Sequence, residues 1–199
     1  MRTKRIIQRR NSSQKYIDSL QNGYSKILVI RVDLAYKKPY SDNIILEEAT
    51  KDLMRLLNNR RNNQTIFEHN IGYIVKKEYS EAKGIHFHAF FFFNGQYLKR
   101  DSFKARQIGN YWCDKITQGE GSYYNCNFNK YPEHGIGMLH HDDTQKREYL
   151  DKAMDYLSKD EQHIEITDKK YRSIVRGTMP RVRSKVGRPR KEDKTYISI

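Results

Sequence analysis

The most apolar stretch of the chain is residues 84–95, Gly-Ile-His-Phe-His-Ala-Phe-Phe-Phe-Phe-Asn-Gly. Side chains of a β-strand alternate between its two faces, so His86 and His88 lie on the same face. Because both faces of this stretch are apolar, the pattern predicts a central strand that is covered on both sides. The two imidazoles are then neighbours in a place with little water, where each needs a polar partner.

A second strand is predicted at residues 71–78, which are rich in β-branched and aromatic residues and precede a turn-like segment. We expect the two strands to form an antiparallel hairpin. With the turn centred near Ala82, Glu78 lies opposite His86, where cross-strand neighbours are about 5 Å apart. Imidazole and carboxylate groups bind divalent ions such as Mn or Mg, and three protein ligands leave positions open for substrate. Glu78, His86 and His88 are therefore candidate metal ligands, and the alternative is that the histidines are structural.

Apolar periodicity predicts further strands and helices around this hairpin. Residues 26–34 are predicted as a buried first strand whose acidic member is Asp33. An Asp at the end of a strand commonly begins a turn, so Asp33 is left out of the candidate site. The element order predicts an α+β fold with a central antiparallel sheet and packed helices. Helices are expected at residues 43–60, 100–115 and 148–159, and further strands at 123–128 and 136–140.

The helix predicted at residues 148–159 carries two Tyr-x-x-Lys units. At about 3.6 residues per turn, the two tyrosines and two lysines lie on one face, beside the buried stripe. A cation near a tyrosine hydroxyl favours the phenolate, which is the form that attacks an electrophile. The alternative is an amphipathic helix whose tyrosines rim the core and whose lysines are solvated. The four residues are Tyr149, Lys152, Tyr156 and Lys159.

Residues 78–95, followed by Tyr-Leu-Ser-Lys at 156–159, resemble the HUH endonuclease superfamily of rolling-circle replication initiators. The resemblance is strongest to the inovirus (filamentous phage) replication protein family that includes the prophage YagK/YfjJ C-terminal domain. It covers about residues 24–180. It implies an HUH/Rep-like core of ferredoxin-like or RRM-like type.

The resemblance also implies an activity, the nicking and rejoining of single-stranded or locally melted DNA. The metal ion held by the three candidate ligands would polarise and orient the scissile phosphate. Tyr156, the better match to the family, would attack the phosphorus to give a covalent 5′-phosphotyrosine and a free 3′-hydroxyl. Lys159, and less directly Lys152, would stabilise the negative charge. Some superfamily members use two tyrosines, so Tyr149 is the second candidate.

The net charge of the chain also indicates DNA as the partner. Lys and Arg number 38 against 24 Asp and Glu in 199 residues, a formal net charge of +14, which attracts polyanions such as DNA. We predict a basic N-terminal arm at 1–22, more mobile than bound, a nuclease domain at 23–180, and a basic tail at 181–199. Residues 186–191 of the tail resemble an AT-hook, a minor-groove element, and the alternative is non-specific phosphate binding. The candidate DNA contacts there are Arg188, Arg190 and Lys191.

Other features bound the cellular setting. The two cysteines, Cys113 and Cys126, predict no disulfide framework and favour a reducing cytoplasm, that of a bacterial host cell in view of the resemblance. No segment approaches the roughly 18 apolar residues of a membrane span, so no membrane partner is expected. The chain has no Walker-type glycine loop, so unwinding of DNA would need another protein, such as the host replication machinery.

Two other functions remain open from the sequence. One is a phage-derived or prophage-derived DNA-binding regulator without nuclease activity, in which the histidines are structural and the tyrosines do no chemistry. The other is an HUH transposase or relaxase, which would share the metal and tyrosine chemistry of a replication initiator.

Overall fold

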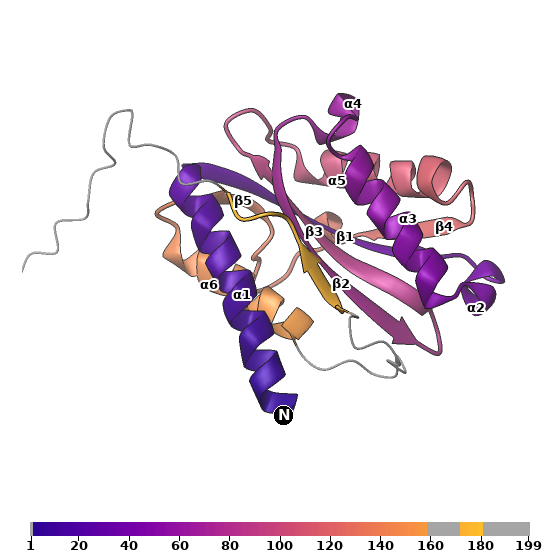
Figure 1. The fold of residues 1–199 in the computed structure, drawn as a ribbon. Helices are drawn as coiled ribbons and strands as arrows, with labels where there is room; N and C mark the ends of the chain where they lie inside the picture. Colours follow the sequence, from indigo (N-terminus) through magenta and orange to yellow (C-terminus); the bar gives the residue numbers. More distant parts are fainter. Residues whose placement is uncertain (1, 159–171, 181–199) are drawn as a thin grey trace, which may run out of the picture.

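Strand β3 (Gly84–Asn94) lies at the centre of a six-stranded antiparallel sheet (Figure 1). The computed structural model describes residues 2–158 and 172–180. The sheet has the order β4-β1-β3-β2-β6, and β5 pairs with β1. Every residue of β3 before Asn94 is buried, as the apolar stretch predicts. The other strands are β1 (Lys26–Tyr36), β2 (Asn70–Ser80), β4 (Gly121–Asn125), β5 (Gly137–His140) and β6 (Ile174–Arg176).

Two layers of helices cover the two faces of this sheet (Figure 1). Phe87, Phe91 and Phe93 of β3 belong to the core that includes α3 and α5. Phe90 and Phe92 belong to the opposite core, with α1 and α6. Burying one such side chain contributes about 1.5–3 kcal/mol, so β3 anchors both layers. The helices are α1 (Arg2–Gly23), α2 (Tyr40–Asn43), α3 (Leu46–Asn59), α4 (Gln64–Phe67), α5 (Asp101–Tyr111), η1 (Trp112–Ile116), η2 (Cys126–Phe128) and α6 (Thr144–Ser158).

The predicted hairpin of β2 and β3 is confirmed, with Glu78 directly opposite His86. The turn lies at residues 81–83, so its centre is at Ala82. Gly84 closes the turn with a φ of 63°, in the left-handed region that favours glycine. A Cβ at this position would also lie 2.4 Å from the carbonyl oxygen of Ser41. The turn thus fixes both the register of the hairpin and the contact of β3 with α2.

The predicted α+β class and the predicted order of elements from β1 to α6 are also confirmed. The predicted strand at 136–140 corresponds to β5, and the π-helical turn η1 continues α5. The predicted strand at 123–128 is only partly correct, because β4 ends at Asn125 and residues 126–128 form the 3₁₀ helix η2. Helix α6 begins before residue 148, its predicted start, because the Asp143 carboxylate accepts a hydrogen bond from the Lys146 N–H at 2.9 Å.

Helix α1 corrects the predicted mobile N-terminal arm. Tyr16, Ile17 and Leu20 of this helix are fully buried against the sheet, and α1 also packs on α6. A few apolar residues inside a strongly basic segment gave too weak a periodicity to predict this packing. The predicted C-terminal tail, 181–199, lies outside the described residues. In the part of the chain that the structure describes, no helix has the length and apolar character needed to cross a membrane.

If α1 is part of the core, Leu20→Ala should lower the free energy of unfolding by about 2–5 kcal/mol, because it leaves a cavity between α1 and the sheet. Urea denaturation followed by circular dichroism measures this change. Ile7→Ala is the matched control, since the Ile7 side chain on the same helix is exposed and should change stability by less than about 0.5 kcal/mol. Equal effects of the two substitutions would contradict the packing of α1.

Candidate metal centre

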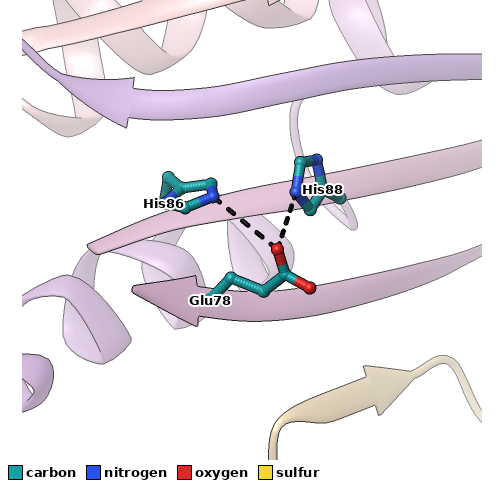
Figure 2. A group of neighbouring side chains, drawn as sticks. All are labelled: Glu78, His86 and His88. Carbon is teal, nitrogen blue, oxygen red and sulfur yellow. Dashed lines mark hydrogen bonds and ion pairs between the residues drawn. The ribbon is translucent and has the colours of Figure 1, made fainter. Parts of the chain in front are cut away.

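Glu78, His86 and His88 converge on the face of the sheet that α1 and α6 cover, close to the turn between β2 and β3 (Figure 2). The Glu78 Oε2 atom lies 3.1 Å from Nε2 of His88 and 3.8 Å from Nε2 of His86. One potential ligand atom from each residue lies within 4.8 Å of the other two. The hairpin register produces this arrangement, because it places Glu78 opposite His86 and the alternation of β3 adds His88 on the same face.

The ring of His86 is oriented by the backbone. Its Nδ1 atom lies 3.0 Å from the carbonyl oxygen of Gly84 in a buried hydrogen bond. Because a carbonyl oxygen only accepts, Nδ1 carries the proton and Nε2 presents its lone pair toward Glu78. Burial lowers the pKa of His86 below its ordinary value, although the Gly84 hydrogen bond opposes this effect. His86 is therefore held as a neutral imidazole, the form that binds a metal ion.

His88 lies between two carboxylates. Its Nδ1 is 2.9 Å from Oδ1 of Asp33, and its Nε2 is 3.1 Å from Oε2 of Glu78. Burial alone would lower the pKa of His88, but the hydrogen bonds to Asp33 and Glu78 outweigh it and raise the pKa to about 8. Without a metal ion, His88 is thus an imidazolium paired on both sides at neutral pH.

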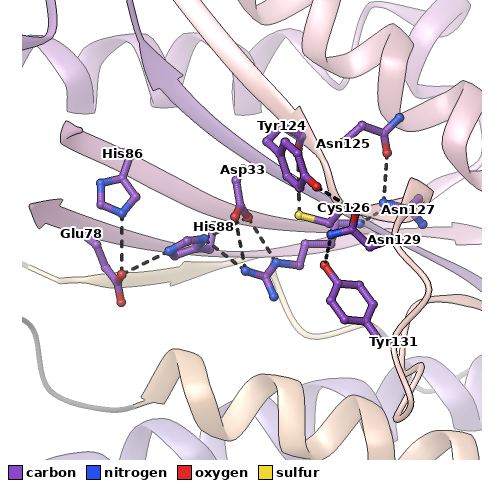
Figure 3. A network of polar contacts seen from close by, with 11 residues as sticks. Asp33, Glu78, His86, His88, Tyr124, Asn125, Cys126, Asn127, Asn129 and Tyr131 are labelled. Carbon is purple, nitrogen blue, oxygen red and sulfur yellow. Dashed lines mark hydrogen bonds and ion pairs between the residues drawn. The ribbon is translucent and has the colours of Figure 1, made fainter. Parts of the chain in front are cut away.

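Asp33 contacts His88 and therefore belongs to the site, although the sequence did not predict this. Strand β1 pairs with β3 so that Asp33 lies opposite His88. Two hydrogen bonds from Arg31, at 3.2 and 3.3 Å, hold the Asp33 carboxylate in place. Figure 3 shows His88 between Glu78 and Asp33. Burial raises the pKa of Asp33, but His88 and Arg31 together lower it below its usual value. An ionised carboxylate on the second nitrogen of a histidine is the common support of a metal-binding imidazole.

Lys76 is a second residue that the sequence analysis did not place in the site. It lies opposite His88 on β2, and its side chain is fully buried. The Lys76 ammonium is 4.0 Å from Oε1 of Glu78. The hydrogen bond with His88 and, less strongly, the charge of Lys76 lower the pKa of Glu78. Glu78 is therefore ionised, as a metal ligand must be.

These three residues fit a divalent ion. Ligand atoms about 2.0–2.2 Å from a metal, at angles of 90–110°, are about 3.0–3.5 Å from one another. The Glu78 carboxylate is already at such a distance from His88 and needs only a small movement toward His86. A cavity of about 340 Å³ adjoins His86 and Asp33 and extends to Tyr124 of β4, so small groups can reach the site. The two imidazoles favour a transition-metal ion, and the carboxylate also admits Mn or Mg.

Helix α6, which carries the candidate tyrosines, packs on the face of the sheet that also carries Glu78, His86 and His88. Leu150, Met154 and Leu157 of α6 pack in the same core as the β3 phenylalanines next to His88. Tyr156 has 53% of its surface exposed. Tyr149 is half-buried, and its hydroxyl accepts a hydrogen bond from Gln145 at 3.1 Å.

Of the candidate lysines and tail residues, only Lys152 lies within the described residues. The Lys152 ammonium donates to Glu133 and lies over the ring of Tyr149, 5.5 Å from its centroid, so it contacts a π-face and a carboxylate. Lys159 and the AT-hook-like segment with Arg188, Arg190 and Lys191 lie outside the described residues, and their roles stay predictions.

Comparison with known proteins identifies a family. The family model of the YagK/YfjJ C-terminal domain matches residues 3–174, a range that begins within α1 and contains the three candidate ligands and Tyr156. Neither a curated protein nor a solved structure matches the chain.

Removal of any one ligand should weaken metal binding. His86→Ala, His88→Ala and Glu78→Ala are each expected to lower the affinity for Mn²⁺ at least about tenfold, because each removes one of three protein ligands. Isothermal titration calorimetry at pH 8 measures the affinity. His141→Ala is the control, since His141 is exposed and lies in the turn after β5. Unchanged affinity in the three variants would rule out this site.

Protons should compete with the metal for His88. Because the pKa of His88 is raised to about 8, the affinity for Mn²⁺ should rise about tenfold between pH 6.5 and 7.5 as the competing proton is lost. Calorimetric titrations across this range test the slope. In Asp33→Asn, one of the two carboxylates that raise the pKa of His88 is gone, so the affinity should be lower but less dependent on pH. An affinity that is constant from pH 6.5 to 7.5 in the natural protein would contradict this account.

Proposed function

We propose that this chain, which belongs to the YagK/YfjJ C-terminal domain family, is an HUH-type endonuclease that nicks and rejoins DNA through a covalent tyrosine intermediate. The reaction is that of rolling-circle replication initiators, and the resemblance to inovirus replication proteins supports this assignment. The observation that carries the proposal is the cluster of Glu78, His86 and His88 on the sheet face that α6 covers.

The protein's own residues prepare the site before substrate binds. Gly84 and Asp33 orient the two imidazoles, and Lys76 lies beside the Glu78 carboxylate. A bound Mg or Mn ion would supply Lewis acidity toward a phosphate oxygen. Preorganised ligands of this kind need little rearrangement when substrate binds.

Tyr156, an exposed residue of α6, is the proposed nucleophile through its side-chain hydroxyl. Its oxygen forms a bond to the phosphorus of a DNA phosphodiester while the bond from phosphorus to the 3′-oxygen breaks. The tyrosine loses its proton and the 3′-oxygen gains one, so the products are a 5′-phosphotyrosine and a 3′-hydroxyl. The reverse reaction rejoins the strand, and no water or external energy source is consumed. Lys159 remains the sequence-based candidate for stabilising the charge that develops.

The charge of the chain supports DNA as the substrate. A net charge of +14 gives long-range attraction to a polyanion and makes association salt-dependent. A replication initiator would work with a polymerase and helicase of the host, in the cytoplasm. A transposase or relaxase of the HUH type would use the same chemistry at a different DNA site.

The proposal predicts a metal-dependent covalent adduct. Single-stranded oligonucleotides from the gene's own locus, incubated with the protein and Mn²⁺ or Mg²⁺, should give an EDTA-sensitive adduct on a denaturing gel. Peptide mass mapping should place it on Tyr156, and Tyr156→Phe should abolish it because the attacking hydroxyl is gone. Tyr97→Phe is the control, since Tyr97 is also exposed but lies in the loop after β3.

The position of the adduct separates the alternatives. An adduct on Tyr149 would keep the chemistry and reverse the choice of nucleophile. DNA binding with no adduct, across the whole locus and with both metals, would refute the endonuclease and favour a DNA-binding regulator.

A further inference from the structure

A basic groove of about 560 Å³ runs between α1 and the β6 edge of the sheet. Four arginines line it, Arg5 and Arg9 from α1 and Arg172 and Arg176 from the β6 segment. Serine and glutamine side chains supply the other polar groups, and none of the described residues that line it is acidic. A concave surface with four guanidinium groups and no carboxylate favours a polyanion.

The strand register places one end of this groove beside the metal centre. Strands β2 and β6 pair antiparallel, with Lys76 opposite Ile174. The pairing continues beyond β6, because the Lys77 N–H donates to the Ser173 carbonyl at 2.7 Å. One further step along the same register places Arg172 opposite Glu78. Arg172, at one end of the groove, therefore lies next to the candidate metal ligand Glu78.

The groove also lies on the same face of the sheet as the metal centre. The Arg176 guanidinium stacks over the ring of Tyr16, 5.3 Å from its centroid, and Tyr16 belongs to the α1/α6 core. Arg176 also donates to Ser12 of α1 at 3.1 Å, so its position is fixed by two contacts. Figure 1 shows α1 beside the gold segment that contains β6. A ligand in the groove can thus continue to Glu78 without crossing the sheet.

The spacing of the arginines distinguishes a chain of phosphates from a single anion. Arg5 and Arg9 are one helical turn apart, about 6 Å along the axis. Arg172 and Arg176 are four strand residues apart, about 13 Å. Charges spread over such lengths match successive phosphates along a backbone.

We propose that the groove between α1 and β6 binds the sugar–phosphate backbone of a single DNA strand and leads this strand to the metal centre. The identity of the ligand as DNA rests on the function proposed above, whereas the site itself rests on the groove. A narrow basic groove that follows one backbone is the usual way to bind a single strand without reading its sequence.

Fluorescence anisotropy with a labelled 20-nucleotide single strand, in EDTA so that no cleavage occurs, tests the groove. The double variant Arg5→Gln/Arg172→Gln removes two exposed charges from the lining. Its affinity should fall about tenfold or more at low salt. The slope of log Kd against log salt should decrease by about 1.4, since each lost phosphate contact on a single strand contributes about 0.7.

Lys51→Gln/Arg55→Gln is the matched control. It removes the same charge from exposed positions of α3, which covers the opposite face of the sheet, and should change the affinity less than twofold. Arg5→Lys/Arg172→Lys keeps the charges and should recover most of the lost affinity. Equal urea midpoints for the variants and the natural protein exclude unfolding as the cause of a loss.

Three results would overturn the proposal. They are equal losses of DNA affinity in the groove and control variants, no loss of affinity in the groove variant, or equal displacement of the strand by polyglutamate or by duplex DNA of the same length.

The test of the groove is independent of the proposed nuclease activity. His86→Ala should keep the DNA affinity in EDTA while the adduct is lost. If no adduct forms but the groove variant loses affinity, only the proposed nuclease activity is refuted. If the adduct forms but the groove variant binds DNA normally, only the proposed DNA-binding role of the groove is refuted.

Discussion

Burial of β3 on both faces is the constraint on which the rest of the structure depends. Its phenylalanines alternate between two cores, so the strand must be central and must have helices above and below it. The same alternation places two histidines on one face near the start of the strand. Because His86 and His88 are also buried, their ring nitrogens need partners within the protein. The hydrophobic pattern of one strand thus creates the need for the polar site.

Different hydrogen-bond partners give the two histidines of β3 different charges. His86 has a backbone carbonyl on one nitrogen and stays neutral, whereas His88 has a carboxylate on each nitrogen and holds a proton up to about pH 8. A metal ion near Glu78 would replace the proton on Nε2 of His88, and the Asp33 carboxylate would remain on Nδ1. The positive charge on His88 in the free protein therefore occupies the electrostatic position that a divalent ion would take.

The sequence allowed prediction of the parts of this site that are close together in the chain. Glu78 and His86 belong to one hairpin, whose short turn sets their register, so their proximity follows from strand alternation alone. Asp33 and Lys76 were missed for different reasons. The register between β1 and β3 depends on contacts far apart in the sequence, which no local pattern specifies. Lys76 lies in the predicted hairpin, but a lysine on a strand gives no local indication that its ammonium will be buried beside a carboxylate.

Helix α1 shows how one element joins the core to the surface. Its second half buries Tyr16, Ile17 and Leu20 on the sheet, whereas its first half carries two of the four arginines of the groove. A sequence this basic looks like a solvated arm because the three buried residues are few and the charges are many. Packing of the second half and the hydrogen bond from Arg176 to Ser12 place the first half beside β6, so Arg5 and Arg9 line the same groove as Arg172. Charges held in this way lose less conformational entropy when they bind an anion than charges on a mobile arm would.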